Sequence, residues 1–424
     1  MRKKWERTKL LDSKPRVCFF VQAAFGTAFT YLTSGVFLSG LAMLMGAGDV
    51  LVSYLSVIFN ICGVLILAFS AFLERFQSRK RLTIGLTILS KLATLLIVAI
   101  PVLVPSGYQL FLFVPAVIVA FTLQAQTTVV LNQWMLGFVD EAKSGRYISL
   151  RQTLTLVVTV ALSLSSGYWM DAAESKYLGF LLLFAAAGLM GLCEVILLAR
   201  TPDSAAYHSS GEGGGMFRGV LRIPLKDRRF TGFVVYILLF YLLLNISDSF
   251  TTVYMMKYLE LPYQTITALN MIISLPQVVL LGIWGRISDR RGHDFVLKSS
   301  IWLFAGETLF MSLASPGSWP IFIPAAFLVA SVANAGFVVA VFNRRYELIP
   351  AGNRIVYDNF YSAAIGIGFI LGPMIGGFLK GGLEASPAVA NVIPFANIRL
   401  LYLISTAGIL LLQIVYLRFD RKRA

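Results

Sequence analysis

The stretch YLGFLLLFAAAGLMGLCEVILLA, residues 177–199, is an almost unbroken apolar run that ends directly before Arg200. Glu194 is its one charged residue. A helix needs about 20 apolar residues to cross the hydrocarbon core of a bilayer. Because lipid offers no hydrogen-bond partners, such a run satisfies its backbone only by forming a helix. The stretch therefore predicts a transmembrane helix.

Eleven further runs of this kind fill most of the chain. The 424 residues are 57% hydrophobic and 13% charged, with a mean hydropathy of +0.77. Globular domains are about 45–50% apolar and about 25% charged. We therefore predict an all-α integral membrane protein with twelve transmembrane helices in two pseudo-symmetric six-helix bundles. The predicted spans are 17–46, 50–73, 82–104, 109–138, 153–170, 177–199, 230–256, 264–284, 297–315, 319–342, 356–379 and 396–417.

Most of the 36 lysines and arginines gather in every second gap between these runs and at the two ends of the chain. Short loops rich in Lys and Arg stay on the cytoplasmic side of a membrane. We therefore expect a multi-pass protein of the plasma or inner membrane with both termini in the cytoplasm. The net charge of +15 then faces anionic lipid, which excludes nucleic acid as the expected partner.

The residues that catalysis or metal binding would need are scarce. Three cysteines lie singly within apolar runs, and the two histidines fall in predicted loops. We find no metal-ligand cluster, no Walker motif and no catalytic pair in the sequence. The expectation is a protein that is not an enzyme, holds no cofactor or metal, and does not use ATP directly.

The longest predicted cytoplasmic segment between two apolar runs covers residues 200–229. Its glycine-rich middle is typical of a flexible linker. It suggests an N-terminal bundle over residues 1–199, a linker over 200–229 and a C-terminal bundle over 230–424. The halves show a weak repeat, in which residues 70–75 align with residues 285–290. Weak repeats of six helices are typical of secondary transporters, whose site lies near mid-membrane between the repeats.

The segment GRISDRRGH, residues 285–293, resembles the G-x-x-x-D-R/K-x-G-R/K loop signature of the major facilitator superfamily. It lies where that superfamily has it, between helices eight and nine. The copy in the first half is degenerate, with Glu74 in place of Asp, although Arg75 is kept. The resemblance implies a secondary transporter, usually monomeric, that binds a small-molecule substrate. The family within the superfamily, the substrate, and the choice between drug efflux and nutrient uptake stay open.

This loop is expected to turn tightly on its glycines and to carry a charge network on the cytoplasmic side. Asp289 can interact with a helix N-terminus, and the arginines can bridge to carboxylates such as Glu347. Such a network can latch one conformation; the alternative is that the basic residues only set the topology. The gate candidates are Glu74, Arg75, Arg146, Gly285, Asp289, Arg290, Gly292, Arg344 and Glu347.

Glycines at four-residue spacing mark one face of helix eleven: Gly368, Gly372 and Gly376, with Gly377 beside them. The run resembles a motif that the drug/proton antiporters of the superfamily carry in helix five, so its position in helix eleven removes most of its value as evidence for drug efflux. Small residues let helices approach closely in lipid. We interpret this face as a packing surface.

Polar side chains inside a bilayer are costly and usually face a cavity. Asn245, Asp248 and Thr252 are spaced to share one face of helix seven. Asp248 is the candidate for proton coupling, since a buried carboxyl group can bind and release a proton. The alternative is that Asp248 lies near the outer interface and caps a helix end.

In the resembled superfamily, helices one, four, seven and ten line the central cavity. The further cavity candidates are Tyr31, Gln124, Gln126, Asn270, Gln277 and Asn334. Each amide can instead form an interhelical hydrogen bond. Lys91, Glu194 and Glu307 are also intramembrane, but on helices that are peripheral in the superfamily, so substrate contact is not expected of them. Glu194 can pair with Lys91, or with Arg200 at the helix end.

Together these features favour a secondary active transporter that moves a small solute by alternating access and is coupled to protons. The alternative from another class is a polytopic sensor or scaffold without turnover. The mid-membrane polar residues count against that alternative, because a scaffold gains nothing from them.

Overall fold

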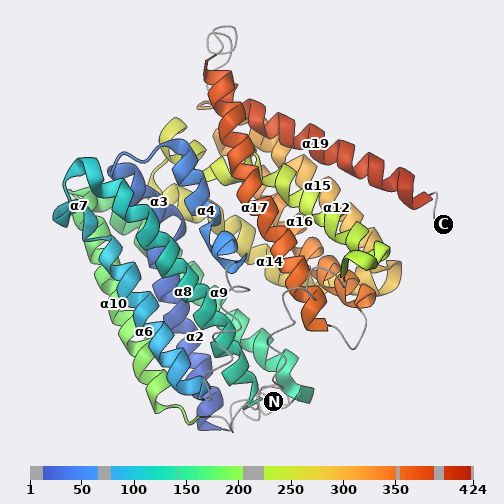
Figure 1. Cartoon of the computed structure of the whole chain (residues 1–424). Helices are drawn as coiled ribbons and strands as arrows, with labels where there is room; N and C mark the ends of the chain where they lie inside the picture. The colour runs from blue at the N-terminus through green and yellow to red at the C-terminus, as the bar shows by residue number, and fades with distance from the viewer. Residues whose placement is uncertain are drawn as a thin grey trace. The chain divides into compact units, whose positions relative to one another are not determined.

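The computed structural model is almost entirely helical in the part of the chain that it describes. The described residues are 13–64, 78–139, 141–203, 224–349, 354–385 and 396–421. The chain divides into two compact units (Figure 1). Unit 1 comprises residues 1–47 and 62–211, and unit 2 comprises residues 48–61 and 212–424.

Unit 1 is a helical bundle. Its helices are α2 (Lys14–Thr33), α3 (Gly35–Leu44), α6 (Arg79–Ile97), α7 (Ile100–Leu103), α8 (Gln109–Leu136), α9 (Glu141–Ala172) and α10 (Lys176–Arg200). α2 packs against α9 and α10, and α6 packs against α8 and α10. At the start of α6 the Ser78 hydroxyl accepts a hydrogen bond from the Arg81 N–H at 3.2 Å, which satisfies a backbone group that the helix leaves unpaired.

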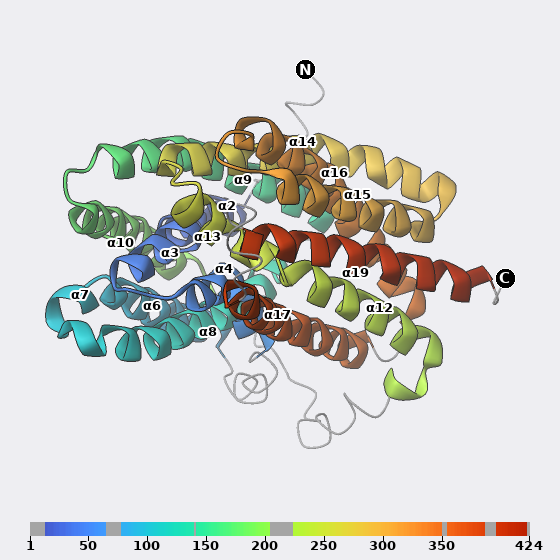
Figure 2. The same ribbon diagram turned by 90° about the horizontal axis from the view of Figure 1, so that it is seen from above.

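Unit 2 is also a helical bundle (Figure 2). It holds α12 (Arg228–Asn245), η2 (Asp248–Phe250), α13 (Thr251–Val253), η3 (Tyr254–Tyr258), α14 (Tyr263–Arg291), α15 (His293–Leu313), α16 (Trp319–Leu348), α17 (Arg354–Glu384), α19 (Ala396–Arg421) and most of α4 (Asp49–Val64). α15 packs against α16 and α19, and α12 packs against α17 and α19.

The beginning of α4 joins unit 2 through a buried acid. Asp49 is 8% exposed, and its Oδ1 accepts a hydrogen bond from the Lys257 ammonium group at 2.6 Å. Its Oδ2 lies 2.9 Å from Nζ of Lys380, which also pairs with Glu384. Two cations around one buried carboxylate offset the desolvation of that charge. This cluster holds the first turn of α4 in place.

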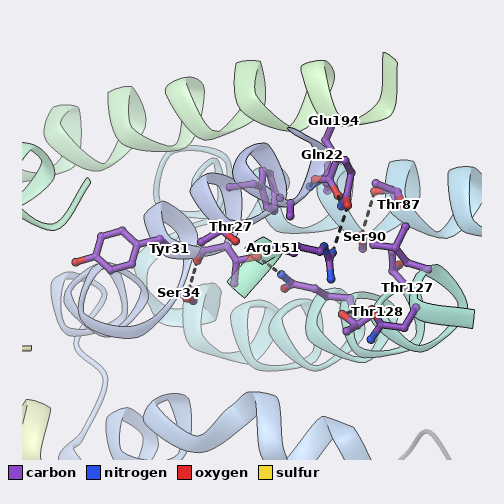
Figure 3. Close-up of a pocket in the computed structure, with 18 of the residues that line it drawn as sticks. Gln22, Thr27, Tyr31, Ser34, Thr87, Ser90, Thr127, Thr128, Arg151 and Glu194 are labelled. Atoms are coloured by element: carbon purple, nitrogen blue, oxygen red, sulfur yellow. Dashed lines mark hydrogen bonds and ion pairs between the residues drawn. The ribbon is translucent and has the colours of Figure 1, made fainter. Parts of the chain in front are cut away.

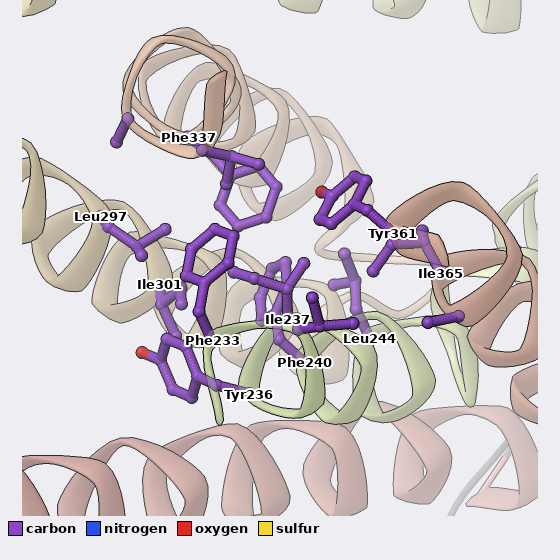
Figure 4. Packing of buried hydrophobic residues seen from close by; sticks show 14 of the residues in the cluster. Phe233, Tyr236, Ile237, Phe240, Leu244, Leu297, Ile301, Phe337, Tyr361 and Ile365 are labelled. Carbon is purple, nitrogen blue, oxygen red and sulfur yellow. The ribbon is translucent and has the colours of Figure 1, made fainter. Parts of the chain in front are cut away.

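Aromatic side chains fill the core of unit 2 (Figure 4). The Phe240 ring lies 5.2 Å from that of Phe304 and 4.8 Å from that of Phe337, measured between centroids. Lipid tails are as apolar as these rings, so water exclusion does not drive their association in a bilayer. Close packing of the rings, through dispersion contacts, stabilises the bundle instead.

Each of the twelve predicted spans overlaps a helix that the structure describes. Nine helices within the described ranges are long and apolar enough to cross a membrane. The helices at the other three predicted spans are α4, α6 and α15. The prediction of an all-helical membrane fold is confirmed.

Several helices extend past their predicted apolar spans. α9 begins at Glu141 instead of residue 153, α14 continues to Arg291, and α16 continues to Leu348. The apolar pattern predicts only the part of a helix that lies in the hydrocarbon of the bilayer. The helical hydrogen bonds of the backbone continue beyond that part, among polar residues. As a consequence Gly285, which was expected to turn a loop, lies within a helix.

The glycine face of α17 packs directly on α12. A Cβ added to Gly372 would lie 2.5 Å from Cβ of Asn245, and one added to Gly376 would overlap the carbonyl oxygen of Ile246. Gly382, on the same helix, has no atom within 4 Å of the position of an added Cβ. The structure agrees with the interpretation of this face as a packing surface.

Gly376→Ala is expected to destabilise the protein by about 1–3 kcal/mol, because overpacking forces neighbouring groups apart. The loss would be measured as a lower unfolding temperature of the purified protein. Gly382→Ala is the matched control, since it adds the same methyl group to the same helix in open space. An equal fall in both variants would contradict the packing role of Gly376.

Candidate functional site

Unit 1 contains a cavity of about 510 Å³ between α2, α6, α8, α9 and α10 (Figure 3). Its lining is rich in polar side chains. The hydroxyl groups come from Thr27, Thr30, Tyr31, Ser34, Thr87, Ser90, Thr127, Thr128 and Thr159, the amides from Gln22, Gln124, Asn132 and Gln152, and the charges from Lys91, Arg151 and Glu194. Ligand pockets typically have volumes of about 300–1,000 Å³, so a small solute fits.

The spacing of the lining residues explains how regular helices form this cavity. Thr87, Ser90 and Lys91 of α6 recur at three or four residues and therefore share one face. Gln124 and Thr128 on α8 do the same. Apolar residues on the other faces meet lipid or neighbouring helices, which leaves the polar faces directed inward.

An ion pair lies in the wall of the cavity. Lys91 Nζ is 2.6 Å from Glu194 Oε2, and the two side chains are 12% and 5% exposed. The Lys91 ammonium group also lies 3.8 Å from the centre of the Phe29 ring, an arrangement that favours a cation. Gly191 makes room for the pair, because a Cβ there would lie 2.8 Å from Cδ of Lys91.

Gln22 connects this pair to a third charge. Its amide group donates a hydrogen bond to Glu194 Oε1 at 2.7 Å, and its carbonyl oxygen accepts one from Arg151 Nη2 at 3.3 Å. Figure 3 shows Gln22, Arg151 and Glu194 converging on the cavity from three helices. Arg151 Nε is buried and has no hydrogen-bond partner among the described residues. The guanidinium group is therefore incompletely satisfied.

Two of the three unit 1 residues predicted to line a cavity do so. Gln124 lines it and donates a hydrogen bond to the Thr30 hydroxyl at 2.6 Å, and Tyr31 is also in the lining. Gln126 is 2% exposed and is not in the lining. The next residue along α8, Thr127, faces the cavity instead.

Helix seven differs from its prediction, because α12 ends at Asn245 and the chain continues as η2, α13 and η3. Near the break the Ser249 hydroxyl donates to the Asn245 carbonyl at 2.7 Å, a bond of the kind that competes with regular helix. Asn245 is 2% exposed and donates to the Tyr241 carbonyl at 2.8 Å. The expected continuous face of Asn245 and Asp248 is therefore not formed.

Asp248 is exposed in unit 2, at the start of η2. Its carboxylate accepts a hydrogen bond from the Thr251 hydroxyl at 3.4 Å, and Thr251 is hydrogen-bonded to the Tyr402 hydroxyl at 2.7 Å. Glu307 of α15 is a second intramembrane acid, 7% exposed, whose Oε2 lacks a hydrogen-bond partner in the described part of the chain. Asp248 and Glu307 are thus two acids of the described part of unit 2 that lie within predicted membrane spans.

The remaining cavity candidates also belong to unit 2. Asn270 and Gln277 lie on α14 and Asn334 lies on α16, all three half-buried. They are therefore not part of the cavity in unit 1. No described hydrogen bond of their side chains assigns them a role.

The loop signature lies at the junction of α14 and α15. Gly285, Asp289 and Arg290 are in the last turns of α14, and Gly292, with φ +86°, is the single residue between the helices. Only at Gly292 does the expected glycine turn occur. Asp289 and Arg290 are exposed.

Charged side chains cluster near this junction. Arg344 Nη1 lies 2.9 Å from Glu347, and Glu347 lies 3.4 Å from Nε2 of His293. Glu74 and Arg75 fall outside the described residues, as does the side chain of Arg146 on α9. The expected latch between the repeats therefore stays a prediction.

Arg151, Glu194 and Lys91 are the functional candidates that sequence reasoning did not place in the cavity. Arg151 looked like one more cytoplasmic charge at the end of a span, but it lies inside α9. The pairing of Lys91 with Glu194, one of two alternatives considered for Glu194, is confirmed. Opposite charges on two apolar helices indicate such a pair in the sequence. Whether the pair lies beside a cavity cannot be predicted from the sequence.

Comparisons with known proteins agree with this fold. Residues 249–424 match the family model of the Major Facilitator Superfamily. A tetracycline resistance protein, class H, from Pasteurella multocida is 30% identical over 147 residues, which are 35% of this chain and 33% of that protein. The match thus spans a third of the length of that relative.

Solved structures are similar over nearly the whole chain. A variant of the nucleoside transporter NupG has a TM-score of 0.71 at 12% identity, covering 95% of this chain and 99% of that one. A D-xylose-proton symporter has a TM-score of 0.65 at 13% identity, covering 95% and 96%. The resemblance to the major facilitator superfamily is confirmed by the family model over residues 249–424, and the solved structures share the fold over nearly the whole chain.

Proposed function

We propose that this chain is a secondary active transporter that carries a small polar solute across the cell membrane by alternating access. The observation that carries the proposal is the cavity in unit 1, where Lys91, Arg151 and Glu194 stand among hydroxyls and amides. Charges inside a bilayer are costly and usually mark a substrate or ion pathway. A sensor or scaffold gains nothing from a polar cavity of this size.

The similar proteins support solute transport without choosing the solute. Their names refer to a nucleoside, to D-xylose with protons, and to tetracycline resistance. Coupling of transport to a proton gradient fits Asp248, an acid in unit 2 with a hydroxyl partner. The solute leaves the protein chemically unchanged, and the protein works as a monomer.

The orientation follows from the distribution of charge. The basic gaps lie on the cytoplasmic side, as do both termini. The membrane is the plasma membrane or the inner membrane. Conjugating an impermeant thiol reagent to a cysteine introduced near the C-terminus, in intact cells and in opened cells, tests this arrangement: labelling is expected only after opening.

The function itself is tested with purified protein in liposomes, by measuring the uptake of a panel of labelled solutes. The matched variants are Gln124→Leu, which removes an amide from the cavity lining, and Gln133→Leu, which removes an exposed amide from the same helix. Loss of one or two hydrogen bonds to the solute is expected to raise KM about tenfold in Gln124→Leu.

Gln133→Leu is expected to leave KM unchanged. Solute uptake with the same KM in both variants would place the binding site outside this cavity. Failure of every solute to move with the unmodified protein would contradict transport itself.

A further inference from the structure

The described lining of the cavity has more basic than acidic side chains. Lys91 and Arg151 are basic, whereas Glu194 is the one acid in the described lining. Glu194 gives one oxygen to Lys91 at 2.6 Å and the other to the Gln22 amide at 2.7 Å. Both oxygens of that carboxylate are therefore in use, and the described lining carries one more positive charge than negative charge.

Arg151 is held in place through a neutral contact. Its Nη2 donates to the Gln22 carbonyl oxygen at 3.3 Å, a long bond, while Nε is buried without a hydrogen-bond partner in the described part of the chain. Guanidinium groups bind carboxylates through two parallel hydrogen bonds. Arg151 is in the lining of the cavity, so its guanidinium group can bind such an anion there.

We propose that the solute of this cavity is a hydroxylated organic monoanion, of the size of a sugar acid, whose carboxylate pairs with Arg151. This inference rests on the proposed function, because it assumes that the cavity is the solute site. One uncompensated positive charge matches one negative charge. Binding then neutralises a cation that is expensive to keep in the membrane interior.

The rest of the lining fits the rest of such a molecule. Nine hydroxyl groups and four amides surround the three charges, and both kinds of group can donate and accept hydrogen bonds. A chain or ring of hydroxyl groups satisfies partners of this kind. The volume of about 510 Å³ accommodates a solute of this size together with water.

Gln22 acts as a positioning residue for the anion site. It is 2% exposed and connects the compensated pair to the uncompensated guanidinium. Because its amide end is fixed by Glu194, its carbonyl end must face Arg151. The Lys91–Glu194 pair therefore orients Arg151 through Gln22, without contacting the solute's carboxylate.

The test uses pairs of probes that differ only in the charged group. Thermal unfolding of the purified full chain is measured with D-gluconate against sorbitol, D-glucuronate against D-glucose, and D-galacturonate against D-galactose. We expect at least one carboxylate to raise the unfolding temperature while its neutral counterpart does not. A ligand that binds only the folded state raises stability in proportion to the logarithm of its concentration over Kd, so each shift yields an affinity.

Variants then assign the effect to Arg151. Arg151→Gln is expected to weaken binding of that carboxylate about ten- to a hundredfold, because a charge-assisted hydrogen bond is lost. Arg151→Lys keeps the positive charge but lacks the planar guanidinium group. Its affinity for the carboxylate should lie between that of the unmodified protein and that of Arg151→Gln. Arg200→Gln, which removes an exposed arginine from the end of α10, is the matched control and should bind like the unmodified protein.

The outcomes separate the two proposals. Binding of the neutral member of a pair as tightly as its carboxylate, with transport intact, overturns the anion site and leaves the transporter standing. Unchanged carboxylate affinity in Arg151→Gln also overturns it. If no solute is bound or moved by the unmodified protein, the proposed function fails and this inference fails with it.

Discussion

Lys91→Met is expected to destabilise the protein by about 3–5 kcal/mol, since removing one partner leaves the other charge buried and unpaired. The carboxylate left behind is that of Glu194, whose side chain is 5% exposed. It would keep only the Gln22 amide as a described partner. The loss is measured as a fall in the unfolding temperature of the purified protein, with solute uptake recorded in parallel.

The control is Lys80→Met, which removes a lysine from the first turn of the same helix, α6. Charges near a helix end contribute about 0–1 kcal/mol, so little change is expected there. The double variant Lys91→Met with Glu194→Gln should recover most of the stability, because no unpaired charge remains. Equal stability of Lys91→Met and Lys80→Met would contradict the buried pair.

The recovered double variant also separates stability from function. If the pair orients Arg151 through Gln22, the double variant folds but binds its solute more weakly than the unmodified protein. A variant that folds and transports normally would show that the pair has only a structural role.

Asp248→Asn is expected to abolish accumulation of solute against its gradient while leaving exchange of solute across the membrane intact. An amide has the shape of the carboxyl group but cannot bind and release a proton at neutral pH. Asp248 accepts a hydrogen bond from Thr251, which the amide oxygen of Asn can also accept. The measurement compares uptake driven by an imposed pH gradient with exchange in its absence, in the same liposomes.

Asp248→Glu is the companion variant, because it keeps an acid at the same position. It should retain part of the gradient-driven uptake. Equal loss of both activities in Asp248→Asn would argue for a binding role in place of coupling. Full accumulation in that variant would remove Asp248 from the mechanism and direct attention to Glu307, a buried acid of unit 2.

The helices of this fold could be predicted from hydropathy because a bilayer imposes one solution on the backbone. Residues 177–199 illustrate this, since α10 covers them almost to the residue. The glycine spacing of α17 predicted a packing face equally well, because two helix backbones can approach closely only where the side chains between them are small. Gly372 and Gly376 do lie against α12.

The cavity could be predicted only in part. Tyr31 and Gln124 were expected there from their depth and from the superfamily's arrangement of helices. Arg151 was not, because a charge pattern assigns every arginine at the end of an apolar run to a loop. α9 begins about three turns before the apolar run does, which moves Arg151 from the loop into the bundle.

The other difference lies in helix seven. Polar residues from Asn245 to Thr252 were expected to share a functional face on a continuous helix. In the structure α12 ends at Asn245, and Asp248–Phe250 form a short 3-10 helix. The apolar pattern of the span continues through this change, so periodicity alone does not predict it.

Counterflow in liposomes tests alternating access most directly. Purified protein is reconstituted, the vesicles are loaded with an unlabelled solute that raises the unfolding temperature, and entry of the labelled solute is followed without any ion gradient. A transporter is expected to accumulate the label transiently, and Gln124→Leu should need about tenfold more solute for the same effect. A solute that binds in the cavity yet shows no such accumulation would make the chain a sensor or scaffold instead of a transporter.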